Sequence, residues 1–238
     1  MPTSTPDPRP LTGEPLALDL LNTRWMREGA LQDLLTDTDG LAVWLAANGL
    51  DERFAADAAT LRHVLRAREA LKAAVDGAPS DAGVDAGSVD AGVDGAPSDA
   101  GVDAGSVDAG VDGAPSDAGV DAGGVDATAM DRAAADPAST GEVDAVLEHG
   151  RIRPTLGPEG PGERAEFADE TWGPAWLAAR NYLELLNTAP DRIRGCAHEA
   201  CVLHFFDTSR NGTRRWCSMA ACGNRAKASR HYARTKDA

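Results

Sequence analysis

The chain has 238 residues, with 23 Lys/Arg against 38 Asp/Glu and a formal net charge of −15. Its first ten residues lack the cationic start and apolar core of a signal peptide, and no stretch approaches the roughly 20 apolar residues that cross a bilayer. We therefore expect a soluble, cytoplasmic protein with no membrane partner.

The charge is unevenly distributed along the chain. Residues 76–127 carry 12 Asp and no Lys or Arg, whereas residues 191–238 carry ten Lys/Arg and four Asp/Glu, a local net charge of +6. Such asymmetry indicates polyanion binding by the basic part. Because salt screens charges beyond about 10 Å, the local charge matters more than the total. We therefore expect DNA as a partner of the C-terminal segment.

The part of the chain before residue 76 shows three helical patterns. Leu16, Leu20 and Leu21 share one face of a first short helix. A second helix can be capped by Asp37 or Thr38 and stop at Asn48-Gly49, and its apolar stripe is Leu41, Trp44 and Leu45. A third helix is predicted from about Asp51 to Val75, with Phe54, Ala58, Leu61, Leu65 and Leu71 inward and Arg62, Arg66 and Arg68 mostly outward.

The middle of the chain is an acidic repeat with a period of 18 residues. The unit DGAPSDAGVDAGSVDAGV starts at Asp76, recurs at Asp94 and starts again at Asp112. Valine is its only sizeable apolar residue, so burial cannot offset the entropy of ordering the segment. A calcium-binding β-roll would need a nine-residue GGxGxD pattern, which the repeat lacks. We expect residues 76–127 to be a disordered linker.

Helical and hairpin patterns resume after the repeat. A helix is predicted near residues 143–148, followed by a hairpin of residues 152–156 and 165–167 around a Gly/Pro-rich turn. A longer helix is predicted from Thr171 to Thr188, with Trp172, Trp176, Leu177, Leu185 and Leu186 as its apolar set. Residues 11–190 therefore read as one mostly helical domain, with residues 76–127 inserted into one of its loops.

All four cysteines lie in the C-terminal segment with the spacing C-x4-C-x15-C-x4-C, at Cys196, Cys201, Cys217 and Cys222. Two close pairs separated by a longer span are what a tetrahedral thiolate site needs. Two disulfides, which need an oxidising compartment, and four free thiols are the competing interpretations. We predict one structural Zn²⁺ ion, because four thiolates complete its shell and leave no open position for catalysis.

The residues between the cysteine pairs predict a small fold around the metal. Residues 202–206 resemble a strand, Asn211-Gly212 is a strong hairpin signal, and residues 213–216 would be the return strand. Ser218 can then cap a helix from about Met219 to Thr235, which places Cys222 in its first turn. Knuckle, hairpin and helix in this order are typical of a treble-clef-like zinc finger. Phe206 and Trp216 would form its small core.

These residues resemble the CGNR zinc finger, which is named for its Cys-Gly-Asn-Arg motif. The similar segments are Phe206-Asp207-Thr208-Ser209-Arg210, Arg214-Arg215-Trp216-Cys217-Ser218-Met219 and Cys222-Gly223-Asn224-Arg225-x-Lys227. The resemblance implies that the four cysteines are the zinc ligands and that the finger binds DNA.

A second resemblance lies near the N-terminus. Leu18-Asp19-Leu20-Leu21-Asn22-Thr23 is similar to the Asp-x-x-Asn-Thr signature that opens the ABATE domain, which commonly precedes the CGNR finger in stress-induced transcription regulators. The acidic repeat departs from that family, where a short inter-helix segment is normal. The expected fold is thus a mainly α domain with a small β-hairpin and a long disordered insertion, followed by a treble-clef-like finger at residues 191–238.

The finger's helix carries a basic face. At 100° per residue, Lys227, Arg230, His231 and Arg234 share an arc of about 100°. A solvated helix and a protein-docking helix are the alternatives to a DNA contact. Asn224 and Arg225 can instead support the zinc site structurally. The candidate nucleic-acid contacts are Arg210, Arg214, Arg215, Asn224, Arg225, Lys227, Arg230 and Arg234.

The N-terminal signature offers a second candidate cluster, Asp19, Asn22 and Thr23, which either lines a ligand pocket or cross-links helices. We find no nucleophile–base pair or phosphate-binding loop, so an enzyme is not expected. The sequence predicts a DNA-binding transcription regulator, associated with the nucleoid when bound, whose N-terminal domain senses a signal or forms a homodimer. The alternatives are a protein-interaction module and a zinc–thiolate redox sensor, both without direct DNA binding.

Overall fold

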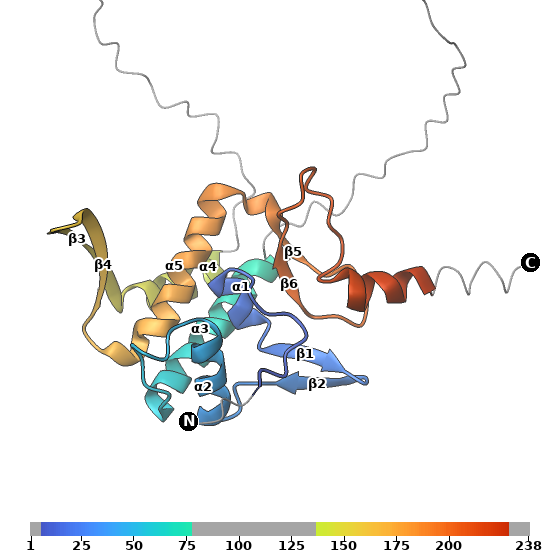
Figure 1. Cartoon of the computed structure of the whole chain (residues 1–238), viewed down its shortest axis with the longest axis horizontal. Helices are drawn as coiled ribbons and strands as arrows, with labels where there is room; N and C mark the ends of the chain where they lie inside the picture. The colour runs from blue at the N-terminus through green and yellow to red at the C-terminus, as the bar shows by residue number, and fades with distance from the viewer. Residues whose placement is uncertain (1–5, 78–136, 229–238) are drawn as a thin grey trace, which may run out of the picture. The chain divides into compact units, whose positions relative to one another are not determined.

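The computed structural model describes residues 6–77 and 137–228 (Figure 1). The acidic repeat from residue 78 onwards and residues 229–235 of the predicted basic helix lie outside these residues. The first described range contains α1 (Leu16–Leu21), β1 (Arg24–Arg27), β2 (Ala30–Asp33), α2 (Thr38–Ala47) and α3 (Ala58–Gly77). The second contains α4 (Pro137–Leu147), β3 (Gly150–Gly157), β4 (Gly160–Phe167), η2 (Glu170–Trp172), α5 (Gly173–Thr188), η3 (Pro190–Arg192), β5 (Ile193–Gly195), β6 (His204–Phe206) and η4 (Met219–Gly223).

The ends of the helices follow local hydrogen bonding. The Asp37 side chain accepts from the Gly40 N–H at 2.9 Å and starts α2, and Gly49 follows its end with φ +64°, so both predicted boundaries are confirmed. The start of α3 was predicted too early. Asp57 accepts from the N–H groups of Ala59 and Thr60 at 2.9 and 2.8 Å, and this cap starts the helix at Ala58, after Phe54 has been buried in the preceding turn.

Each pair of strands in the described residues forms an antiparallel hairpin. The β3–β4 hairpin was predicted, although it is longer than expected and turns through Pro158 and Glu159. The β1–β2 hairpin was not predicted. Its turn uses Glu28 and Gly29, with φ of 53° and 80°. Glutamate rarely occupies this left-handed region, so the turn carries no strong sequence signal.

The third hairpin differs from the prediction. Strand β6 pairs with β5, which precedes the first cysteine, and residues 213–216 form no strand. The reason is the buried Asp207 carboxylate, which accepts from the N–H groups of Ser209 and Arg214, both at 2.9 Å. The side chain thus bonds the N–H group that a return strand would offer to its partner. A turn still forms here, but it spans residues 209–212 and is closed by a hydrogen bond from the Gly212 N–H to the Ser209 carbonyl at 3.2 Å; Gly212 has φ +62°.

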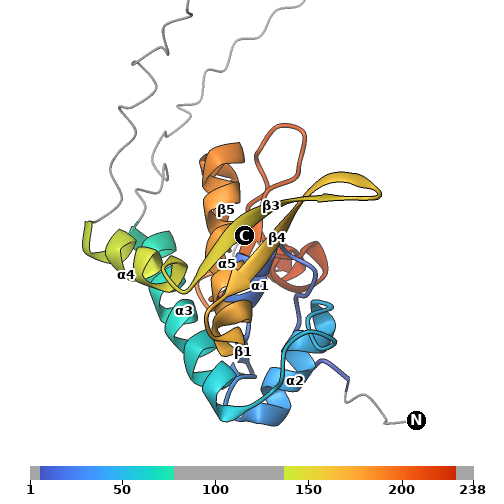
Figure 2. The ribbon, with the colours of Figure 1, turned by 90° about the vertical axis from the view of Figure 1, so that its left-hand side faces the viewer.

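One hydrophobic core joins the helices and the C-terminal segment. Helix α3 packs against α1, α4 and α5, and α3 and α4 lie side by side in Figure 2. The core contains Leu18, Trp44 and Val64, and it continues into the cysteine-containing segment through Leu203 and Phe205. Phe206 and Trp216, predicted as the finger's own core, are only partly buried. The finger is therefore packed on the helical domain instead of around its own small core.

Two residues of α3 face differently from the prediction. Ala58, predicted inward, is exposed at the helix start. Arg68, predicted outward, is 2% exposed and forms a bidentate ion pair with Asp33 at 2.7 and 2.8 Å. Its guanidinium also donates to the Thr23 hydroxyl at 2.9 Å. The helical periodicity predicted Arg68 on the outer face. Its burial is compensated mainly by the Asp33 carboxylate, and Glu69 Oε1 also lies 3.7 Å from its Nε.

Candidate metal centre and its contacts with the N-terminal domain

The four cysteines come from two places in the fold and meet at one point. Cys196 directly follows β5 and Cys201 lies in the loop before β6, whereas Cys217 precedes η4 and Cys222 lies inside it. Their sulfur atoms all lie within 4.8 Å of one another. The Sγ atoms of Cys201 and Cys217 are 3.8 Å apart, and those of Cys217 and Cys222 are 3.7 Å apart.

These distances fit one zinc ion. A tetrahedron of sulfurs at the usual Zn–S distance of about 2.3 Å has edges of about 3.8 Å. Cys217 and Cys222 are buried and the other two cysteines are partly buried, as expected for a closed structural site. The four cysteines are therefore positioned to bind one structural Zn²⁺ ion through four thiolates.

The pKa values of three of the cysteines also favour a cation bound between them. Hydrogen bonds from Cys201 and Cys217 stabilise the Cys196 thiolate and lower its pKa. Cys201, which donates to that sulfur and is repelled by its charge, has its pKa raised to about 12. For the same reasons the pKa of Cys217 is raised. Repulsion thus opposes the simultaneous ionisation of these three thiols. A Zn²⁺ ion between them would relieve it, and its binding would release the protons.

The backbone around the site is held by hydrogen bonds. The Cys196 N–H donates to the Leu203 carbonyl at 2.9 Å, and the Ala197 N–H donates to the Arg215 carbonyl at 2.8 Å. The Ser218 hydroxyl accepts from the Ala221 N–H at 3.4 Å and caps η4, as predicted. These bonds connect both cysteine pairs to β6 and to the helix start.

The basic residues of the finger divide into two groups. Arg214, one of the predicted nucleic-acid contacts, is partly buried and bonds to other residues of the finger. It donates to the carbonyls of Trp216 and Cys217, and its guanidinium lies 4.2 Å from the centre of the Phe205 ring. These contacts hold the guanidinium within the finger, and its role as a nucleic-acid contact stays a prediction.

The remaining candidate contacts that the structure describes are exposed. Within residues 6–77 and 137–228, no ion pair involves Arg210, Arg215, Arg225 or Lys227. Arg230 and Arg234 lie outside the described residues, so their placement stays a prediction. The exposed members are Arg210, Arg215, Asn224, Arg225 and Lys227.

The N-terminal cluster Asp19, Asn22 and Thr23 is buried and hydrogen-bonded within the protein. The Asp19 carboxylate, 1% exposed, accepts from Arg9 Nη1 at 2.7 Å and from Trp44 Nε1 and Asn48 Nδ2 at 3.0 Å each. Thr23 donates to the Leu20 carbonyl at 2.7 Å and accepts from Arg68. These contacts bond Asp19 and Thr23 to neighbouring groups, which favours the cross-linking alternative over a ligand pocket.

Asn22 connects the N-terminal domain to the finger. Its side-chain amide is fully buried, donates to the His204 carbonyl and accepts from the His204 N–H, both at 2.8 Å. Glu14, just before α1, accepts from the Phe206 N–H at 2.9 Å and from Arg214 Nη2 at 3.5 Å. Sequence analysis missed Glu14 and the partner of Asn22, because these partners lie 182 to 200 residues further along the chain and leave no local pattern.

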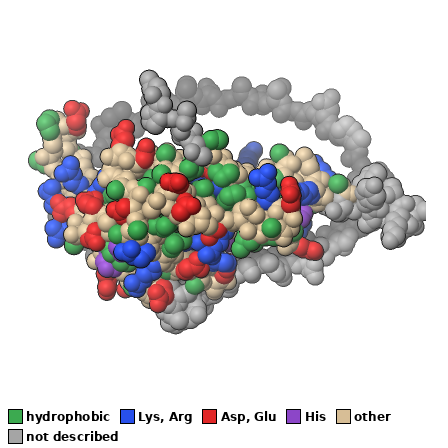
Figure 3. Space-filling model, turned by 90° about the horizontal axis from the view of Figure 1, so that it is seen from below, with side chains coloured by type: hydrophobic (Ala, Val, Ile, Leu, Met, Phe, Trp, Pro, Cys, Tyr) green, Lys and Arg blue, Asp and Glu red, His purple; other side chains and the backbone are tan. Residues whose placement is uncertain are grey.

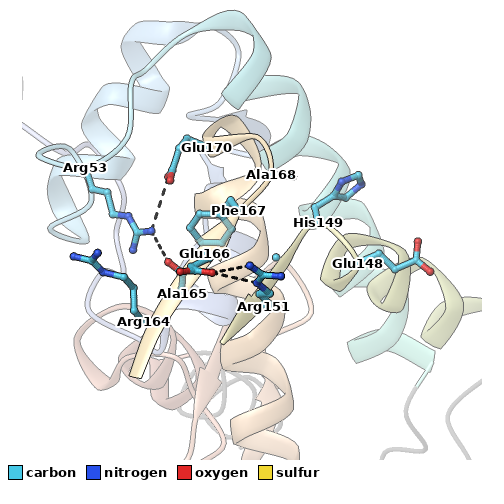
Figure 4. Close-up of a pocket in the computed structure, with 11 residues that line it drawn as sticks. Arg53, Glu148, His149, Arg151, Arg164, Ala165, Glu166, Phe167, Ala168 and Glu170 are labelled. Carbon is cyan, nitrogen blue, oxygen red and sulfur yellow. Dashed lines mark hydrogen bonds and ion pairs between the residues drawn. The ribbon is translucent and has the colours of Figure 1, made fainter. Parts of the chain in front are cut away.

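A separate pocket of about 880 Å³ lies beside the β3–β4 hairpin (Figure 4). Arg53 donates to the Ala165 carbonyl at 2.9 Å and lies near Glu170, while Arg151 pairs with Glu166. The pocket contains none of the predicted ligand residues. Figure 3 shows acidic and basic side chains interspersed over one face of the molecule, without a large area of one sign.

Comparison with known protein families agrees with this arrangement. The model of the ABATE family, described as "Putative stress-induced transcription regulator", matches residues 14–189, which is more than half of the chain. The chain belongs to the ABATE family. The model of the CGNR zinc finger matches residues 192–235 and includes all four cysteines. A search of curated proteins finds no match.

The two family matches meet at η3, between the ABATE domain and the finger. The Asp-x-x-Asn-Thr signature lies at the start of the ABATE match, in and directly after α1. Among the described residues, no helix is both long and apolar enough to cross a membrane.

Proposed function

We propose that this ABATE protein is a cytoplasmic transcription regulator that contacts DNA at the nucleoid through its CGNR finger. The observation that carries the proposal is the group of exposed finger cations Arg210, Arg215, Arg225 and Lys227, which form no ion pair within the described part of the chain. The family's description as a transcription regulator supports the same function.

A polyanion is the partner that these charges favour. Cations held on one small module repel one another, and a phosphate backbone relieves that repulsion and releases counterions on binding. Phosphate contacts of this kind position a protein without reading sequence. Base reading needs a bidentate Arg or Asn, and our candidates are Asn224, Arg225 and Arg230, of which the first two are described and exposed.

In this proposal zinc has a structural role. With the ion bound, the first cysteine pair between β5 and β6 and the second at the start of η4 would give the finger a treble-clef-like fold. Four thiolates would fill a tetrahedral shell and leave no position for a substrate, so we propose that the protein is not an enzyme. The ABATE domain would sense a signal or form the homodimer.

Salt-dependent binding to duplex DNA tests the proposal. Replacing Lys227, Arg230 and Arg234 by glutamine should weaken binding at least about tenfold at moderate salt, and should lower the slope of log K against log salt by about one for each lost phosphate contact. Zinc content should not change.

A matched control replaces the same number of exposed arginines in the ABATE domain, Arg27, Arg62 and Arg66, by glutamine. This control should keep the affinity of the parent, because these arginines lie outside the finger. The overall charge changes equally in the two triple variants, so a difference between them reports the position of the charges. Equal binding by both variants would remove the finger helix from the contact surface and favour a protein-docking role. Zinc release under mild peroxide by a parent protein that does not bind duplex DNA would instead favour the redox sensor.

A further inference from the structure

The outer edge of β6 is covered by side chains of the ABATE domain. On one edge this strand pairs with β5, in the register Arg194 to Phe205. On the other edge, the N–H and C=O groups of His204 bond to the Asn22 amide, and the Phe206 N–H bonds to Glu14. The Asn22 and Glu14 side chains therefore bond the backbone N–H and C=O groups that a neighbouring strand would otherwise have to satisfy.

A second line of contacts leads from the same edge to a zinc ligand. Glu14 Oε1 lies 3.5 Å from Arg214 Nη2, and Arg214 donates to the carbonyls of Trp216 and Cys217. The opposite side of β6 is bonded to the other cysteine pair, because the Cys196 N–H donates to the carbonyl of Leu203, the residue before the strand. Strand β6 thus connects Asn22 and Glu14 to the backbone of the first cysteine pair, and Arg214 connects Glu14 to the backbone of the second.

We propose that Asn22 and Glu14 are positioning residues for the zinc site, so that zinc affinity and the stability of the ABATE domain are thermodynamically linked. The Asn22 amide is 0% exposed, and its donor and acceptor are both satisfied by the finger. Loss of zinc loosens β6 and leaves this buried amide unpaired, which destabilises α1. By reciprocity, a folded ABATE domain holds the cysteines ready and increases the affinity for zinc.

The test uses the full-length protein with Asn22→Ala. Competition with a chromogenic chelator gives the zinc affinity, which should fall about tenfold or more because two buried hydrogen bonds to β6 are lost. Thermal unfolding is then measured for parent and variant, each with zinc and after metal removal. Asn22→Ala should lower the transition temperature strongly with zinc bound, and much less in the metal-free protein, in which the finger no longer holds the amide.

Asn181→Ala is the matched control. This asparagine also bonds to α1, accepting from the Ala17 N–H at 3.1 Å, and it contacts no finger residue among its described hydrogen bonds. It should lower the transition equally with and without zinc and leave zinc affinity unchanged. A purely structural role for Asn22 would give the same pattern as Asn181, and that result would overturn the proposal.

Glu14→Ala provides a second variant if Asn22→Ala fails to fold. Glu14 lies at the domain edge and is partly buried, so its removal affects the finger contact more than the helical core. Zinc should leave this variant faster than it leaves the parent. Parent-like zinc affinity and release in Glu14→Ala would overturn the proposal. Neither readout involves nucleic acid, so failure of the proposed DNA contact would not affect the outcome.

Discussion

Replacement of the signature residue Asp19 by asparagine should destabilise the ABATE domain. Its carboxylate Oδ1 accepts from Arg9, Trp44 and Asn48, while Oδ2 accepts from the Gly13 N–H at 3.2 Å. An asparagine keeps only one acceptor oxygen, so its NH₂ group must face either the Gly13 N–H or the three donors at Oδ1. The negative charge that balances the fully buried Arg9 is lost as well.

The size of the effect follows from the partners that remain. Breaking a buried ion pair by removing one partner costs about 3–5 kcal/mol. Arg9 keeps its second partner, Asp7, at 2.7 Å, so we expect the lower end, about 3 kcal/mol. For a domain of this size each kcal/mol shifts the thermal midpoint by about 2–4 °C. Asp19→Asn should therefore lower the midpoint by about 6–12 °C.

Differential scanning calorimetry at pH 7 on the zinc-loaded protein measures this shift. Asp51→Asn is the control, because Asp51 is exposed in the turn after α2 and should change the free energy of unfolding by no more than about 0.5 kcal/mol. If Asp19→Asn melted within about 2 °C of the parent, the carboxylate would not be the structural centre described above.

Three further predictions concern acid stability, the metal and the repeat. Burial alone would raise the pKa of Asp33, but hydrogen bonds from Arg68 and Arg24 lower it below its ordinary value of 3.8. The contribution of Asp33 to stability is therefore present above that pH and is lost as the pH falls through the lower folded-state pKa. In urea unfolding, the stability of Asp33→Asn should fall less steeply at acid pH than that of the parent. Cys217→Ser should reduce zinc from about one ion per chain to almost none in metal analysis, and retention of a full equivalent would contradict the ligand assignment. Deletion of residues 78–127 should leave the thermal midpoint of the zinc-loaded protein nearly unchanged and tighten binding to duplex DNA at low salt, since it removes 11 Asp and no cation; a large loss of stability would show that the repeat packs.

The sequence predicts those parts of the structure that depend on neighbouring residues. The Asp37 cap, the Asn48-Gly49 end of α2 and the Ser218 cap are formed within a few residues, and each was predicted correctly. The metal site was also accessible, because Cys spacing directly limits which sulfurs can meet.

Features that depend on distant partners were not predictable in the same way. The periodicity of α3 predicted Arg68 on the exposed face, because its ion-pair partner Asp33 lies on β2 and leaves no pattern in the helix sequence. The Asn211-Gly212 turn suggested a return strand, but Asp207 bonds the backbone from the side. Asn22 was recognised as a polar signature residue, whereas its role depends on His204, which lies 182 residues further along the chain.

The same separation has a consequence for synthesis on the ribosome. At about 5–20 residues per second, His204 is made roughly 10–40 s after Asn22, so Asn22 exists for that time without the strand to which it bonds. Until then the amide that will bond to β6 must remain hydrated or find a temporary partner. The C-terminal segment thus completes the fold last, and a chain truncated before residue 204 would lack the partner of the Asn22 amide.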